Sequence, residues 1–331
     1  MSEYQSLLVV SFGGPEKRDD VMPFLKNVLR GRNVPEARML EVAEHYYQFD
    51  GLSPINQQNR DLIQALQQDF DQQGIDLPIY FGNRNWHPMI PDTLSKMKQD
   101  GINKSLAFFT SGYSCYSGCR QYREDIINAR QTVGTDAPTV DKLRVFFNHP
   151  FFVEACGLRL QEGMAQLSDP GDLFVVFTAH SIPQSMANGC RYEAQLQEAS
   201  RLVADHCQIA NWKLVYQSRS GPPHQPWLEP DVCDYMDQIK QEGFKRVVVM
   251  PIGFLSDHME VIFDLDVEAK EKCEELDLEM VRAKTVGTHP KFVEMIRDLI
   301  LERMNSSEKK VIGQMPASHD VCPTNCCLRS S

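Results

Sequence analysis

The stretch SLLVVSFGGPE at residues 6–16 has the pattern of a buried strand that runs directly into a loop containing Gly and Pro. The stretch DLFVVFTAHSIP at residues 172–183 repeats that pattern. A near-continuous apolar run indicates a strand covered on both faces, as in a parallel sheet. The similarity of the two stretches suggests a weak internal duplication, with one copy opening each half of the chain.

Further short β-branched and aromatic runs alternate with helical patterns along the chain. Alternation of this kind builds parallel sheets covered by helices, with ligands bound beyond the carboxyl ends of the strands. We therefore predict an α/β fold of two similar Rossmann-like domains at residues 1–148 and 149–305. Each domain has a four-stranded parallel sheet, the active-site cleft lies between them, and a cysteine-bearing tail follows at 306–331. The remaining strands are expected at residues 77–83, 104–110, 142–148, 212–218, 245–254 and 278–287.

Composition narrows the class of protein. The chain has 331 residues, 42% of them hydrophobic and 24% charged, which excludes a disordered protein. A formal charge of −11 makes nucleic acid an unfavourable partner. No apolar stretch approaches the ~18 residues of a membrane span, and no basic region precedes the first apolar run. We expect a cytoplasmic protein with at most peripheral membrane contact, and the oligomeric state is left open.

His180 follows the apolar run of FTAHSIP at residues 177–183, at the end of a predicted strand. Near neutral pH an imidazole in such a place can accept a proton or bind a transition metal. An isolated histidine there more often only hydrogen-bonds its own turn, so a site needs a second group.

PIGFLSDHMEVIFDLDVEAK at residues 251–270 supplies that second group. A helix after a strand would carry Glu260, Asp264 and Glu268 at four-residue intervals, on one face. Like charges at this spacing weaken a helix, so the row favours a bound cation, either Fe²⁺ or Mg²⁺. The alternative is a solvated acidic face.

Taken in order, SFGGPE, DGLSP near residue 50, FTAHSIP and PIGFLSDHMEV resemble the ferrochelatase family, lyases that insert ferrous iron into a porphyrin in haem biosynthesis. The resemblance covers most of the chain and implies the chelatase fold. It implies that His180 and Glu260 face each other across the porphyrin plane. His180 would accept a proton or transiently bind the metal, and Glu260 would orient it, take a proton or deliver iron. Asp264 and Glu268 would continue outward as metal ligands.

The resemblance also implies a porphyrin-binding set. Phe12 stands where some bacterial members carry an iron-ligating Tyr, so other groups must hold the iron. The stretch TSGYSCYSGCRQYRED is similar to the branch that uses coproporphyrin III, which we prefer over protoporphyrin IX as the substrate. Propionates are held by Arg forks and hydroxyl donors, although the arginines could equally be surface charge. The candidates are Phe12, Arg30, Arg32, Ser53, Tyr113, Tyr116 and Tyr122.

The tail carries Cys322, Cys326 and Cys327 as C-x₃-C-C. Family members with a [2Fe–2S] cluster hold it on three C-terminal cysteines and one internal cysteine, which the resemblance places at Cys156 in FFVEACGLRL. A [2Fe–2S] cluster needs four such ligands. Zinc on the same thiolates, or a tail without metal, are the alternatives.

Two other functions remain open at this stage. One is a chelatase of the same fold that inserts cobalt or nickel into a tetrapyrrole. The other is a non-catalytic haem-binding or haem-delivery protein, in which His180 only ligates iron.

Overall fold

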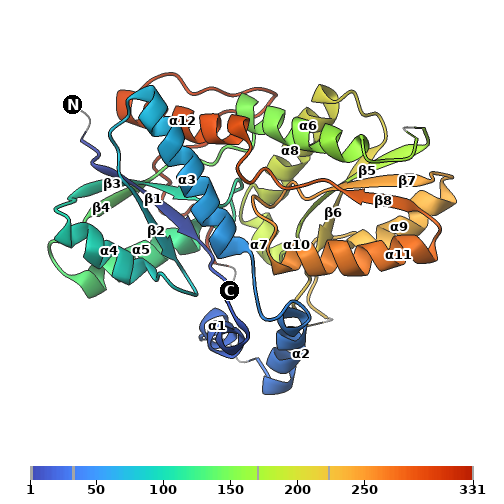
Figure 1. Cartoon of the computed structure of the whole chain (residues 1–331), viewed down its shortest axis with the longest axis horizontal. Coiled ribbons are helices and arrows are strands. Elements are labelled where there is room, and N and C mark those ends of the chain that lie inside the picture. The colour runs from blue at the N-terminus through green and yellow to red at the C-terminus, as the bar shows by residue number, and fades with distance from the viewer. Residues whose placement is uncertain (1–2, 32–33, 170, 223, 330–331) are drawn as a thin grey trace.

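Two four-stranded parallel sheets with the same strand order form the frame of the protein (Figure 1). The computed structural model describes residues 3–31, 34–169, 171–222 and 224–329. The orders are β2-β1-β3-β4 and β6-β5-β7-β8, which confirms the predicted fold class; the domain boundary at 148/149 stays a prediction. The strands are β1 (Ser6–Ser11), β2 (Ile79–Asn83), β3 (Lys104–Phe109), β4 (Thr139–Lys142), β5 (Leu173–His180), β6 (Trp212–Gln217), β7 (Arg246–Met250) and β8 (Glu279–Arg282).

Helices cover both faces of each sheet, as the fully buried β1 requires. Two segments are π-helices, η2 (Tyr116–Arg120) and η3 (Asp264–Ala269), and η1 (Arg18–Asp20) is a 3₁₀ turn. The α-helices are α1 (Val21–Val28), α2 (Glu36–Tyr47), α3 (Ile55–Gln73), α4 (Ile90–Gln99), α5 (Gln121–Val133), α6 (Pro150–Met164), α7 (Gln184–Asn188), α8 (Tyr192–His206), α9 (Val232–Gln241), α10 (Met259–Phe263), α11 (Lys270–Glu275) and α12 (Pro290–Asn305).

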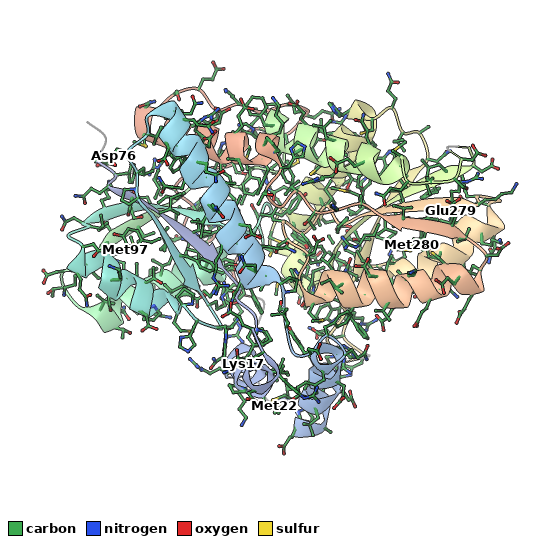
Figure 2. All side chains as sticks on the ribbon, in the orientation of Figure 1. Lys17, Met22, Asp76, Met97, Glu279 and Met280 are labelled. Atoms are coloured by element: carbon green, nitrogen blue, oxygen red, sulfur yellow. The ribbon has the colours of Figure 1, made fainter. Side chains whose placement is uncertain are left out.

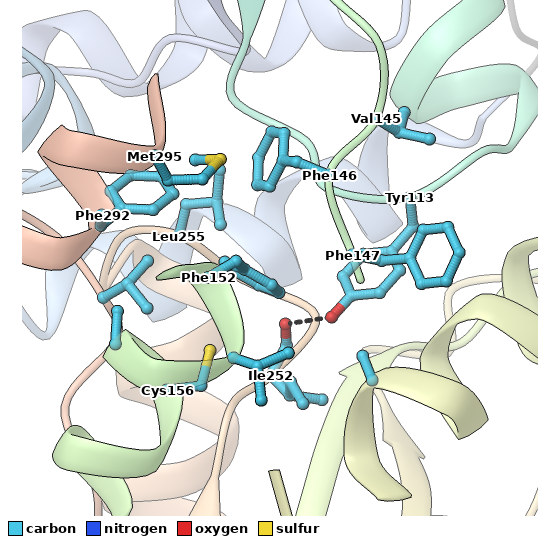
Figure 3. Packing of buried hydrophobic residues seen from close by; sticks show 14 of the residues in the cluster. Tyr113, Val145, Phe146, Phe147, Phe152, Cys156, Ile252, Leu255, Phe292 and Met295 are labelled. Carbon is cyan, nitrogen blue, oxygen red and sulfur yellow. Dashed lines mark hydrogen bonds between the residues drawn. The ribbon is translucent and has the colours of Figure 1, made fainter. Parts of the chain in front are cut away.

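A shared hydrophobic core joins the two halves. Phe146 packs against Phe152 of α6 and Phe292 of α12, with ring centroids 5.3 and 6.0 Å away (Figure 3). The strand predicted at 142–148 is therefore wrong beyond Lys142: β4 covers Thr139–Lys142, and the apolar run after it packs in the junction. The apolar residues after Lys142 are apolar because they are buried between the two halves, and not because they pair with another strand.

Helices α1 and α2 lie together below both sheets in Figure 1 and enclose a small core of their own. Phe24 of α1 contacts Tyr46 of α2 and Trp86 edge to face, at 5.8 and 6.4 Å between ring centroids. Lys17 and Met22 mark the start of this helical pair in Figure 2. We call α1 and α2 the lip.

The tail after α12 runs across both halves. The Ile312 backbone N–H donates to the Asn148 carbonyl at 3.0 Å, and the Gln314 N–H donates to the Glu198 carboxylate at 2.6 Å. Lys142 donates to the carbonyl of His319 at 3.2 Å. Within the described ranges, no helix has the length and apolar character needed to cross a bilayer.

Candidate active site

His180 and Glu260 form an ion pair at the carboxyl edge of the second sheet. His180 is the last residue of β5, and Glu260 lies in the first turn of α10, which follows β7. Their Nε2 and Oε1 atoms are 3.5 Å apart. The His180 Nδ1 contacts the Ser181 carbonyl, so Nε2 is the nitrogen directed at Glu260. Two segments 80 residues apart in the sequence thus meet in direct contact, and the expected arrangement on opposite sides of a porphyrin plane stays a prediction.

Each partner holds the other in its charged form. Burial alone would lower the pKa of the His180 imidazole, but the Glu260 carboxylate outweighs it and raises that pKa to about 9. Burial likewise opposes ionisation of Glu260, but the His180 charge lowers its pKa to about 2. At neutral pH the resting site contains an imidazolium and a carboxylate.

Two further groups face Glu260, and sequence reasoning did not assign either to the site. His258 places its Nδ1 3.8 Å from the Glu260 Oε2, and burial lowers the pKa of His258. Tyr46 comes from the lip, and burial together with the Glu260 charge raises the pKa of its hydroxyl. His258 belongs to the same SDHMEV stretch and could have been found there. Nothing around Tyr46 in the sequence indicates the contact.

The acidic row continues from Glu260 through a π-helix. We expected one regular α-helix over the row, but α10 gives way to η3 at Asp264. Burial raises the pKa of Asp264 to about 7; the Ser218 hydroxyl opposes the rise, and the charges of Glu260 and Glu268 add to it. Burial and Asp231 raise the pKa of Glu268. Asp264 is thus within electrostatic reach of both Glu260 and Glu268, and π-helical turns are frequent at functional sites.

The acidic row does not form a closed metal site by itself. Over the ranges that the structure describes, no group of three or more His, Cys, Asp or Glu side chains is arranged to hold a metal ion.

Three residues expected at the porphyrin have different surroundings. Phe12 follows β1, is 36% exposed and contacts Phe24 of the lip edge to face at 6.2 Å. Arg30 is exposed, and its Nη2 donates to the Asn27 Oδ1 at 2.6 Å. Ser53 is buried, and its N–H donates to the carbonyl of Pro15 at 2.9 Å. Arg32 lies outside the described residues.

The three tyrosines predicted to bind propionates have partners within the protein, and their contact with the porphyrin stays a prediction. The Tyr113 hydroxyl is buried and donates to the Ile252 carbonyl at 3.0 Å, across the two halves (Figure 3). Tyr122 is buried beneath the Arg84 guanidinium, 3.7 Å above its ring. Tyr116 donates to Glu124 at 3.0 Å. These side chains fasten the loop and η2 to the frame.

The tail cysteines meet an internal thiol, but it is Cys119 of η2 and not Cys156. Cys119 and Cys322 share a thiol–thiol hydrogen bond, which lowers the pKa of Cys322 and raises that of Cys119. The sulfurs of Cys326 and Cys327 are 3.6 Å apart, and the charge of Cys327 also acts on Cys119. Lys142 and Arg123 further favour a Cys322 thiolate.

The prediction of Cys156 as the internal ligand is wrong in this structure. Cys156 lies inside α6 and is 1% exposed (Figure 3). The neighbouring thiol that affects its pKa is Cys207. Its place in the core of the junction explains its apolar surroundings. Cys119 reaches the tail because Arg120, the next residue, donates to the Thr324 and Cys326 carbonyls at 2.7 and 3.0 Å.

Comparisons with known proteins point to one family. A family model described as Ferrochelatase matches residues 4–304. Ferrochelatase of Rhodopirellula baltica is 59% identical over 330 residues, covering 98% of this chain and 93% of that protein. Coproporphyrin III ferrochelatase of Streptomyces coelicolor is 47% identical, covering 98% and 94%. The structure of SirB from Bacillus subtilis with Fe³⁺ has a TM-score of 0.56 at 11% identity, covering 92% and 97%, which shows a shared fold.

Proposed function

The chain belongs to the ferrochelatase family of lyases, which insert iron into a porphyrin in haem biosynthesis, and on that premise we propose coproporphyrin III as its substrate. Support comes from the relatives of known name, several of which are coproporphyrin III ferrochelatases covering more than nine-tenths of this chain. Protoporphyrin IX is the alternative. A cytoplasmic location remains a prediction from the sequence.

The observation that carries the mechanism is the His180–Glu260 pair. Metallation removes two pyrrole N–H protons, and a base near neutral pKa is suited to take them. The resting imidazole is already protonated, because Glu260 faces it at 3.5 Å. A ferrous ion that binds Glu260 neutralises the charge that keeps His180 protonated, so the imidazole releases its proton to solvent when the metal arrives. The free imidazole then accepts the two pyrrole protons one after the other, passing the first to solvent before it takes the second. We assign His180 as the proton acceptor and Glu260 as the iron-delivering ligand.

Asp264 and Glu268 extend the delivery route outward in our proposal. Carboxylate oxygens suit Fe²⁺ before it reaches pyrrole nitrogens. Burial raises the pKa of both carboxyls, and the charges of Glu260 and Glu268 raise that of Asp264 further, so a cation relieves repulsion as it passes.

The porphyrin would lie between the lip and the second sheet. Phe12 offers an exposed aromatic face, and Arg30 offers N–H groups for a propionate. Ser53 would serve only after local movement, because it is buried in the structure.

We further propose a [2Fe–2S] cluster on Cys119, Cys322, Cys326 and Cys327. Each iron of such a cluster takes two thiolates. Cys119 shares a hydrogen bond with Cys322, and the sulfurs of Cys326 and Cys327 are 3.6 Å apart, so the described thiols form two pairs that the irons would have to draw into one site. Two pairs suit two irons better than the single tetrahedron that zinc requires. A cluster bound there would tie the tail to η2, a structural or regulatory role that involves no electron transfer in metal insertion.

The substrate proposal is tested by an anaerobic Fe²⁺ insertion assay that offers coproporphyrin III and protoporphyrin IX in parallel and follows loss of the free-base spectrum. Faster turnover of coproporphyrin III supports it. Faster turnover of protoporphyrin IX refutes the proposed substrate but does not affect the assignment to the family.

The cluster proposal is tested on protein purified anaerobically, by iron and sulfide content and by the EPR signal after reduction. Cys119→Ser should remove the cluster, and Cys156→Ser should retain it. Zinc without sulfide in the unsubstituted protein, or cluster loss in Cys156→Ser alone, would refute the assignment.

A further inference from the structure

Gln217 and Ser218 lie beside the acidic row but come from a different strand. β6 ends at Gln217, and this residue is the register partner of His180 on β5. The Ser181 N–H donates to the Gln217 carbonyl at 2.8 Å. The end of β6 is therefore held level with the catalytic histidine by the sheet itself.

Both side chains reach the point where α10 passes into η3. The Ser218 hydroxyl donates to Oδ2 of Asp264. The Gln217 Nε2 donates to the Glu260 carbonyl at 2.7 Å and lies 3.4 Å from the same Asp264 Oδ2. One side chain thus fixes the backbone of the first acidic residue, and both fix the carboxylate of the second.

The local backbone and burial set this contact apart from an ordinary surface hydrogen bond. Ser218 has φ +62°, in the left-handed region that a serine seldom adopts without compensation. Gln217 is 1% exposed, and its Oε1 is buried with no hydrogen-bond partner among the described residues. An unpaired buried amide oxygen costs free energy. The hydrogen bonds that Nε2 donates to the Glu260 carbonyl and to Asp264 are therefore the interactions that hold this amide in place.

We propose that Gln217 and Ser218 are positioning residues, which orient the Asp264 carboxylate and the Glu260 backbone so that ferrous iron passes from one to the other. This rests on the proposed iron route. It assigns neither residue any contact with the porphyrin. Their loss should therefore weaken the use of Fe²⁺ and leave porphyrin binding unchanged.

Ser218→Gly is the decisive variant, because glycine adopts positive φ freely and removes only the hydroxyl. We expect KM for Fe²⁺ to rise about tenfold, with kcat at saturating iron and KM for coproporphyrin III within about twofold. Ser220→Gly, an exposed serine of the same loop, is the matched control and should leave all three constants unchanged. An unchanged KM for Fe²⁺ in Ser218→Gly, or equal rises in both KM values, would overturn the proposal.

A double-mutant cycle separates this proposal from the iron route on which it rests. If Ser218 acts through Asp264, Ser218→Gly should add nothing to the KM for Fe²⁺ of Asp264→Asn. Additive effects would show that Ser218 acts elsewhere, and would leave the route standing. If the KM for Fe²⁺ does not rise in Asp264→Asn, both the iron route and the positioning role of Ser218 are refuted.

Discussion

His180 and Glu260 each stabilise the charged form of the other before substrate binds. The imidazolium and carboxylate are 3.5 Å apart, and the pKa of each is displaced in the direction that favours the pair. Such paired shifts are typical of sites that handle protons. The acid–base state of His180 is therefore controlled by whatever occupies Glu260.

Replacing Glu260 by Gln should lower the pKa of His180 from about 9 to below its ordinary 6.5, since burial is then the largest remaining influence. Titration of the imidazole C–H signals by NMR measures this directly. Glu268→Gln is the control and should leave the His180 pKa near 9. Retention of that value in Glu260→Gln would mean that another anion charges the histidine.

The same pair predicts a pH window for stability. His180 has a raised pKa, so its contribution is complete below about 6.5 and is lost as pH rises through about 9. Glu260 has a lowered pKa, so its contribution is present above about 4.5 and is lost as pH falls toward 2. A double-mutant cycle with His180→Gln and Glu260→Gln, followed by urea unfolding, should give coupling at pH 5.5 and almost none at pH 10. Equal coupling at both would contradict the ion pair.

For single residues, the sequence predicts which side chains carry reactive groups better than it predicts which other residues contact them. His180 and Glu260 were identified because each follows a strand in a distinctive stretch. Tyr46 and Ser218 were missed because their contacts depend on how the lip and the end of β6 pack against α10. No spacing in the chain records those distances.

Strand predictions agree with the structure where an apolar run pairs with a neighbouring strand. They fail where an apolar run is buried against helices without strand pairing. The two opening strands, β1 and β5, follow the predicted pattern closely. The run after β4 contacts α6 and α12 instead of a strand. The tyrosines of the loop, of η2 and of α5 contact partners within the protein. A pattern of apolar residues indicates that a segment is buried, but it does not indicate which helix or strand covers that segment.

Tyr113→Phe should destabilise the protein by about 1–3 kcal/mol, because the buried Ile252 carbonyl loses its donor. Urea unfolding measures the loss, and KM for the porphyrin should not change. Tyr116→Phe, whose partner Glu124 is partly exposed, should cost less than about 1 kcal/mol. A raised porphyrin KM with unaltered stability would return Tyr113 to the substrate site.

For the whole molecule, the tail and α12 close the junction through one buried ion pair. Arg144 is 2% exposed, its Nε and Nη2 donate to Glu302 at 2.8 and 3.0 Å, and Nη2 also reaches the Lys310 carbonyl at 2.9 Å. The segment predicted as a strand thus supplies the cation that anchors the start of the tail.

Arg144→Met should cost about 3–5 kcal/mol, because it leaves Glu302 buried without a cation. Arg144→Met with Glu302→Leu should recover most of that loss. Unfolding in urea measures both, and Arg38→Met in an exposed pair should change stability by less than about 1 kcal/mol. A small loss in the single variant would mean that water reaches Glu302.

The matching strand orders of the two sheets have a consequence for symmetry. Phe12 follows β1 and His180 ends β5, so corresponding edges of the two halves present an aromatic ring on one side and an imidazole on the other. Two identical halves assembled as separate chains would have to present the same group on both sides. A single chain has no such constraint. In the function proposed above, one half holds the flat ligand and the other moves protons and metal, so a two-fold scaffold carries a reaction with two different sides.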